Sequence, residues 1–245
     1  MSGHSKWSTI KHKKAFSDAK KAKMFSKISR MISVAVKEKG HNPDTNFPLR
    51  LALEKARAIN MPTDNIQRTI KKASTESTEK LESVQFEGYG PGGVALIIEA
   101  ITDSRNRTSA EIRHLLSVHN GNMAIPGSVA WMFEKQGIIE VEGPASKRDE
   151  IEMCAIEAGA EDIITVSEDT MMIVTKPEDL HHIKNILTEK GFIVQNQEYQ
   201  YTAKNKMSVD DAATQKAIEN LWDALDDHED VQEIYTNYDI IDITS

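Results

Sequence analysis

Cysteine is nearly absent from this chain, because Cys154 is the only one among 245 residues. A single thiol cannot form an intramolecular disulfide, and it cannot supply the set of cysteines that a cysteine-based zinc site needs. This cysteine usage is typical of proteins from reducing compartments. Ile151 and Ala155 share an apolar helix face with Cys154, so we expect a buried core residue there.

Long hydrophobic runs are also missing. The longest, residues 94–98, has the length of a strand and is far too short to span a bilayer. The residues after Met1 are polar and basic, so the apolar segment of a signal peptide is not visible. We therefore expect a cytoplasmic protein with no membrane partner.

Recognisable catalytic motifs are lacking as well. The sequence contains no His-Glu-x-x-His, no Gly-x-Ser-x-Gly, no dinucleotide fingerprint and no set of kinase motifs. The glycine-rich residues 88–93 are not followed by Gly-Lys-Ser/Thr, which favours a tight turn over a phosphate-binding loop. The expectation is a protein that is not an enzyme, with no catalytic residues, no metal, no cofactor and no small-molecule substrate. An enzyme whose site is assembled from distant residues remains an alternative.

Acidic residues are missing from the first 17 positions, although the whole chain carries a net charge of −8. Residues 1–72 hold 17 Lys and Arg against 5 Asp and Glu, whereas residues 73–245 have a balance of −20. Such asymmetry is typical of proteins with a nucleic-acid or anionic-surface partner. The alternative is ordinary solvated surface charge.

The basic residues lie on an N-terminal arm and on the helix predicted to follow it. Met24, Ile28, Met31 and Ala35 repeat at helical spacing and indicate an amphipathic helix that ends near Gly40. At about 100° per residue, the basic side chains form a stripe on the opposite face. Cations placed in this way contact phosphates and give affinity without sequence specificity. The candidate nucleic-acid-binding residues of the arm and stripe are Lys6, Trp7, Lys11, His12, Lys13, Lys14, Lys20, Lys21, Lys23, Lys27 and Arg30.

Trp7 is the aromatic residue of the arm and stands among lysines. Its ring can stack on an unpaired base, which favours single-stranded or folded RNA as the ligand. The alternative is that Trp7 anchors the arm on the helical core.

Arg105 and Arg107 complete the candidate nucleic-acid-binding set. They stand at the start of a predicted helix, where backbone N–H groups and arginines together can hold a phosphate or a carboxylate. In the alternative reading, Asp103 or Ser104 caps the helix and the arginines pair with acids in solvent.

The pattern of predicted elements gives an α+β fold with an N-terminal three-helix bundle and two α+β domains. Asn46 and Thr63 are expected to cap the second and third helices of the bundle. We place the basic arm and helical domain at residues 1–75, an α+β domain at residues 82–136 plus 206–245, and an inserted domain at residues 137–205.

The inserted domain follows the order β-α-β-β-α-β of the ferredoxin-like split βαβ. The helix at 210–226 and the strand at 230–235 have no partner there, so we expect them to return to the second domain. A strand is predicted at 128–133, before the insertion. The acids of residues 226–230 are expected to form a solvated loop.

Several stretches resemble those of a known family. Gly-His-Ser-Lys-Trp (3–7), Glu-Gly-Tyr-Gly-Pro-Gly-Gly (87–93) and Gly-Ser-Val-Ala-Trp-Met-Phe (127–133) are similar to motifs of the YebC/PmpR family. Further similar stretches are residues 11–15, 18–20, 105–108, 157–162 and 230–235. The resemblance implies a three-domain α+β protein of the bacterial cytoplasm, described as a transcriptional regulator that binds DNA. It also implies relatives in mitochondria that activate translation of a respiratory-chain subunit, and a family role on the ribosome in difficult peptide-bond formation.

We therefore expect a nucleic-acid-binding regulator of gene expression, in first place a DNA-binding transcriptional regulator. The alternative is a translation factor that binds the ribosome or its RNA and relieves stalling or activates translation. The arm chemistry favours this alternative, because the sequence lacks a recognition helix with Asn, Gln and Arg at base-reading positions.

Overall fold

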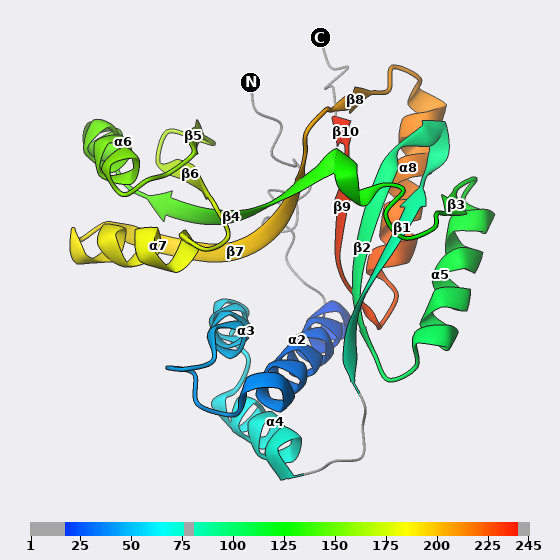
Figure 1. Ribbon diagram of the computed structural model, residues 1–245, viewed down its shortest axis with the longest axis horizontal. Helices are drawn as coiled ribbons and strands as arrows, with labels where there is room; N and C mark the ends of the chain where they lie inside the picture. Colours follow the sequence, from blue (N-terminus) through cyan, green and yellow to red (C-terminus); the bar gives the residue numbers. More distant parts are fainter. Residues whose placement is uncertain (1–17, 76–80, 240–245) are drawn as a thin grey trace. The chain divides into compact units, whose positions relative to one another are not determined.

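The computed structural model describes residues 18–75 and 81–239. These residues form a mixed α+β fold in two compact units. One unit is the continuous segment Phe133–Thr202, and the other contains the described residues on either side of it. The smaller unit is therefore inserted into the larger one, which confirms the predicted fold class (Figure 1).

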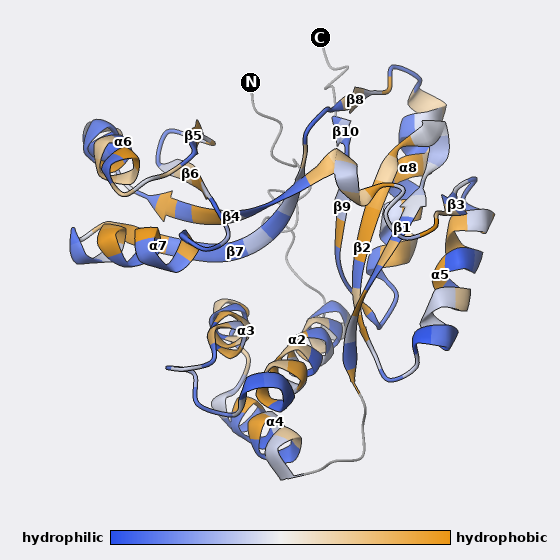
Figure 2. Cartoon of the chain, in the orientation of Figure 1, coloured by the Kyte–Doolittle hydropathy of each residue, from blue (hydrophilic) through white to orange (hydrophobic). Residues whose placement is uncertain are grey.

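The larger unit begins with a three-helix bundle. Ile28 and Ile32 of the first helix pack with Leu49 of the second and Ile66 of the third in one buried cluster. Apolar residues three or four positions apart fall on one side of a helix, so each helix carries both an apolar and a polar side (Figure 2). The helices are α2 (Asp18–Lys39), α3 (Phe47–Ala58) and α4 (Thr63–Thr75).

Asn46 joins the end of α2 to the start of α3. Its side-chain oxygen accepts a hydrogen bond of 3.1 Å from the backbone N–H of Leu49, which confirms the predicted N-cap. Its amide nitrogen donates to the backbone carbonyls of Ala35 and Gly40, each at 2.6 Å. The side chain is fully buried, and these three bonds satisfy it there.

The larger unit also contains a four-stranded antiparallel sheet, in the order β3-β1-β2-β9. Strand β9 pairs with β2, with Leu96 opposite Thr236, which confirms that the C-terminal helix and strand return to this unit. The strands are β1 (Glu82–Tyr89), β2 (Ala95–Thr102), β3 (Asn122–Met123) and β9 (Val231–Thr236); the helices beside them are α5 (Arg105–Val118) and α8 (Ala212–Asp226). A short parallel pair joins β8 (Met207–Ser208) to β10 (Tyr238–Asp239).

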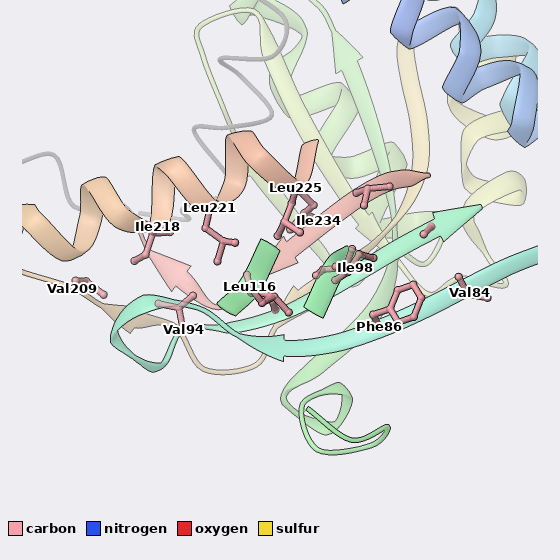
Figure 3. Close-up of a cluster of buried hydrophobic side chains, with 14 residues drawn as sticks. Val84, Phe86, Val94, Ile98, Leu116, Val209, Ile218, Leu221, Leu225 and Ile234 are labelled. Carbon is pink, nitrogen blue, oxygen red and sulfur yellow. The ribbon is translucent and has the colours of Figure 1, made fainter. Parts of the chain in front are cut away.

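The core of this unit lies between the sheet and its two helices. Ile98 of β2 and Ile234 of β9 belong to the same buried cluster as Leu116 of α5 and Leu221 and Leu225 of α8 (Figure 3). Burying a side chain of this size stabilises the fold by about 1.5–3 kcal/mol. The cluster therefore fixes the two helices on one face of the sheet.

The glycine-rich segment after β1 is the predicted tight turn. Gly90 donates its backbone N–H to the carbonyl of Val94 at 2.7 Å, and a short helix, η1 (Pro91–Gly93), lies between them. Gly92 and Gly93 have φ values of +71° and +82°, which side chains with a Cβ rarely adopt. The turn leads the chain directly from β1 into β2.

The predicted strand at 128–133 is wrong. A turn and a short helix, η2 (Ala130–Met132), occupy this place, and strand pairing begins only at Phe133. The physical reason is the carboxylate of Glu87, which accepts the backbone N–H groups of Gly127, Val129 and Ala130. Those groups are therefore unavailable to a neighbouring strand.

The inserted unit has the ferredoxin-like topology that the sequence predicts. Its strands lie in the order β5-β6-β4-β7, and the buried residues Ile139, Ile151, Ile173 and Ile183 come from both strands and helices. Cys154 is buried as expected, and burial raises the pKa of its thiol. The elements are β4 (Phe133–Glu142), η3 (Ala145–Lys147), α6 (Arg148–Glu157), β5 (Asp162–Thr165), β6 (Thr170–Thr175), α7 (Leu180–Glu189) and β7 (Ile193–Ala203).

Candidate nucleic-acid interface

The predicted interface begins on the N-terminal arm. Six of its candidate residues lie outside the described part of the chain: Lys6, Trp7, Lys11, His12, Lys13 and Lys14. The structure describes the helix that continues from the arm, where Lys20 and Lys21 in the first turn are exposed. These two lysines are the described cations nearest to the arm in sequence.

The next three cations of the stripe are half-buried and bind acids of the same unit. The ammonium of Lys23 lies 3.0 Å from the Asp227 carboxylate, and that of Lys27 lies 3.2 Å from the Asp226 carboxylate. Lys27 also donates to the backbone carbonyl of Asp226 at 2.8 Å. These lysines interact with the C-terminal end of α8, where backbone carbonyls and the helix dipole favour positive charge.

Arg30, the last cation of the stripe, reaches the loop between α8 and β9. Its guanidinium pairs with the Asp230 carboxylate, lies 3.6 Å from Glu229, and donates to the backbone carbonyl of Ile101 at 3.2 Å. The acids of residues 226–230 were predicted to form a solvated loop. That prediction is wrong, because these acids bind the cationic face of α2. We call residues 226–230 the acidic tract.

Asp230 is the best-connected side chain of the acidic tract. Only 3% of its side chain is exposed, and its second oxygen accepts from the Thr108 hydroxyl at 2.6 Å and from Arg107 at 2.8 Å. Burial by itself raises the pKa of this carboxyl, but the hydrogen bonds from Thr108, Arg107 and Arg30 outweigh it and lower the pKa to about 2. Asp230 is therefore ionised at neutral pH.

The two arginines of the predicted anion site differ in their surroundings. Arg107 pairs with Asp230, with Asp103 at 2.9 Å and with Glu111 at 3.8 Å, and Asp230 raises its pKa. Arg105 is exposed on the first turn of α5. The carboxylate of Asp230 therefore occupies the place beside Arg107 where an external anion was expected.

The cap of α5 also differs from the expectation. Ser104 occupies the N-cap position, but its side chain makes no capping hydrogen bond. Instead, the Thr102 hydroxyl accepts the backbone N–H of Ser104 at 2.9 Å and lies 2.8 Å from the Thr108 hydroxyl. Thr102 thereby connects the end of β2 to the network around Asp230.

A pocket of about 500 Å³ opens beside this network. Its lining includes Glu111, His228 and Asp230, whose side chains bring three potential metal-binding atoms within 4.8 Å of one another. Arg30 and Arg107, however, both bind the Asp230 carboxylate and would repel a cation. His228 accepts the backbone N–H of Asp230 through Nδ1, so its proton lies on Nε2, 3.0 Å from Glu111. Glu111, His228 and Asp230 are therefore bound into a network of ion pairs and hydrogen bonds rather than arranged as metal ligands.

Sequence reasoning missed one exposed aromatic residue of the larger unit. Trp131 lies on η2 with 66% of its surface exposed, and Ile125 in the preceding loop is 76% exposed. The strand predicted at 128–133 concealed the exposure of Trp131, because alternation along a strand would bury one face; Ile125 lies just before that strand. Within the described residues, no helix combines the length and hydrophobicity that crossing a membrane requires.

Two family models cover almost the whole chain. The model described as "TACO1/YebC protein N-terminal domain" matches residues 5–76, and the one described as "TACO1/YebC second and third domain" matches residues 81–238. The first comprises the arm and the three helices, and the second comprises both α+β parts.

Relatives of similar length carry a regulatory name. A protein of Halothermothrix orenii is 47% identical over 99% of this chain and 96% of its own length. A protein of Kosmotoga olearia is 48% identical over 99% of this chain and 96% of its own length. Each is named "Probable transcriptional regulatory protein". The crystal structure of a conserved hypothetical protein from Aquifex aeolicus has a TM-score of 0.86 and 40% identity, covering 98% of this chain and all of that one.

Proposed function

Because this chain belongs to the TACO1/YebC family, we propose that it is a regulator of gene expression that binds nucleic acid through its basic N-terminal segment. The observation that carries the proposal is the segregation of charge, with an excess of 12 positive charges in residues 1–72 of an otherwise acidic chain. Clustered lysines bind phosphates and release the counterions that surround a nucleic acid. The names of the relatives favour a role in transcription.

The cations of the segment divide into two groups in this proposal. The arm residues, together with the exposed Lys20 and Lys21, contact phosphates directly. Lys23, Lys27 and Arg30 already bind the acidic tract, so a nucleic acid reaches them only by displacing carboxylates. Arg105 is exposed and open to a phosphate, whereas Arg107 carries three acidic partners.

The second candidate is a translation factor that binds ribosomal or messenger RNA. Trp7 among lysines suits stacking on an unpaired base. The described helices offer phosphate contacts rather than a recognition helix for the major groove. A protein that holds phosphates and stacks on bases, without reading base edges, fits folded RNA better than a promoter.

A binding assay with matched charge variants tests the proposal. We would replace Lys11, Lys13, Lys14 and Lys20 with Gln in one variant. The control replaces Lys147, Lys176, Lys184 and Lys190 of the inserted unit, which changes the net charge equally. The first variant should lose at least tenfold in affinity and show a shallower salt dependence, by about 0.7–0.9 in slope per lost phosphate contact. Equal losses in both variants would show that net charge alone, rather than this segment, determines binding.

The two candidate functions predict different ligands, promoter DNA for one and ribosomes for the other. Promoter DNA that is bound at nanomolar concentration with discrimination between sequences supports the transcriptional role. Salt-sensitive co-sedimentation with ribosomes, together with indifference to promoter sequence, supports the translational role. Absence of binding to both would refute the proposed function.

A further inference from the structure

The loop between β3 and β4 presents a large aromatic ring to solvent. Trp131 is 66% exposed, although tryptophan is among the most buried residues on average. Its neighbours Val129 and Phe133 are buried, so the segment is anchored on both sides of the exposed ring. An exposed tryptophan on an anchored segment is a common feature of binding surfaces.

A buried carboxylate holds this segment in place. Glu87 of β1 is 7% exposed and accepts the backbone N–H groups of Gly127 and Val129 at 2.6 Å and of Ala130 at 2.8 Å. Burial acts to raise the pKa of Glu87, but these three hydrogen bonds outweigh it and lower the pKa. The Tyr89 hydroxyl adds a long contact of 3.4 Å to the Ser128 carbonyl. These contacts fix the backbone of the segment that carries the Trp131 ring before any ligand binds.

The indole of Trp131 has no free donor to offer a ligand. Its N–H donates to the carbonyl of Ser128 at 2.9 Å, within the same turn. What remains for a ligand is the aromatic face, which suits stacking rather than hydrogen bonding. Every nucleobase has a face that stacks on such a ring, so this contact is tolerant of sequence.

The backbone of Lys204 is hydrogen-bonded to the residue that follows Trp131. The backbone N–H of Lys204 donates to the carbonyl of Met132 at 2.9 Å, and Lys204 is exposed. A stacking ring, with an exposed lysine whose backbone is hydrogen-bonded to the next residue, matches the two parts of a nucleotide, its base and its phosphate.

We propose that Trp131 and Lys204 form a second nucleic-acid contact that takes an unpaired nucleotide, with the base on Trp131 and the phosphate at Lys204. The inference rests on the proposed function and makes it more specific, because it names nucleic acid with unpaired bases as the ligand. A base that is stacked and paired inside a duplex cannot reach the ring without being unpaired first.

The test compares Trp131→Ala, Trp131→Phe and Lys204→Gln in the full chain. The ligands are a fluorescent 20-nucleotide single strand and the duplex of the same sequence. One stacked base contributes about 1–3 kcal/mol, so Trp131→Ala should weaken single-strand binding by roughly 5- to 150-fold and change duplex binding less than twofold. Trp131→Phe should keep most of the affinity, and Lys204→Gln should reduce the salt slope by about 0.7. Met153→Ala on α6 is the control, since Met153 is 63% exposed and lies in the other unit.

A ¹⁹F NMR measurement at Trp131 distinguishes contact with the nucleic acid from an effect of the substitutions on folding. The full chain is labelled with 5-fluorotryptophan, and the ¹⁹F resonance of Trp131 is identified by its loss in Trp131→Phe. The single strand should shift this resonance, and the duplex should not. Unchanged single-strand affinity in Trp131→Ala with no shift would overturn this inference and leave the proposed function standing. Equal losses for both ligands would also overturn it, and absence of any binding by the wild type would overturn both.

Discussion

The guanidinium of Arg30 binds the carboxylate of Asp230, 200 positions later in the chain. This ion pair connects α2 of the helical bundle to the loop that precedes β9, within the larger unit. Lys23 and Lys27 extend the same contact to Asp227 and Asp226. The cationic stripe is therefore held by ion pairs within the fold. Substitutions in the stripe must be tested for their effect on stability as well as on nucleic-acid binding.

Replacing Asp230 with Asn should lower the free energy of unfolding. The neutral amide cannot compensate Arg30 and Arg107, and a buried carboxylate with a lowered pKa contributes about 2–3 kcal/mol. Chemical denaturation measures the loss. Asp227→Asn is the control, because 74% of the Asp227 side chain is exposed and an exposed ion pair contributes less than about 1 kcal/mol. Equal effects of the two substitutions would contradict the central role of Asp230.

The stability of the protein should depend on pH through the same carboxyl. Its pKa is about 2 in the folded state, against 3.8 for an ordinary Asp, so the unfolded chain binds the proton first as pH falls. The contribution of Asp230 is complete above about pH 5 and is lost as pH falls towards 2. The wild type minus Asp230→Asn difference in unfolding free energy should therefore shrink by about 2 kcal/mol across this range. A difference that stays constant from pH 5 to pH 2 would argue against the low pKa.

Neutralising the exposed part of the acidic tract should strengthen nucleic-acid binding. In a variant with Asp226→Asn, Asp227→Asn and Glu229→Gln, Lys23 and Lys27 lose their carboxylate partners and can reach phosphates. We expect a several-fold higher affinity and a steeper salt dependence in a fluorescence-anisotropy titration. The control neutralises Asp149, Glu150 and Glu157 of α6, which are exposed in the inserted unit and change the net charge equally. A gain no larger than that of the control would place these lysines outside the interface.

Replacing Glu87 with Gln should release the loop that carries Trp131. An amide can accept through one oxygen only, and its NH₂ group would face backbone N–H donors, which leaves at least one of them unsatisfied. The expected cost is about 1–3 kcal/mol, with faster hydrogen exchange at Gly127, Val129 and Ala130. Glu82→Gln, an exposed position on the same strand, is the control. If these amides exchange at unchanged rates, the carboxylate does not hold the loop.

Local patterns in the sequence were enough to predict much of this fold. Ile28 and Ile32 follow the helical period, Asn46 has the side chain of an N-cap, and the order of elements in the inserted unit identifies its topology. Each of these patterns involves residues that are close together in the sequence, or the order in which helices and strands follow one another. Such patterns reflect local interactions along the chain, such as helical periodicity and capping.

The contacts around the candidate site could not be predicted in the same way. Lys27 and Asp226 are 199 positions apart, and neither has a local feature that identifies its partner. Glu87 likewise changes a predicted strand into a turn 40 positions away. Charged pairs between distant segments depend on the tertiary fold, so composition could indicate a cationic stripe but not the acids that cover it.

The insertion also sets the order in which the larger unit can be completed during synthesis. One edge of β2 pairs with β9, which the ribosome produces roughly 130 residues after β2. At about 5–20 residues per second, the edge that carries Ile97 and Ile98 stays open for roughly 6–26 s while the residues between β2 and β9, the inserted unit among them, are made. An open apolar strand edge can pair with another chain during that time. The nascent protein is therefore most exposed to misassociation between the emergence of β2 and the arrival of β9, so slow translation of the insertion would lengthen this period.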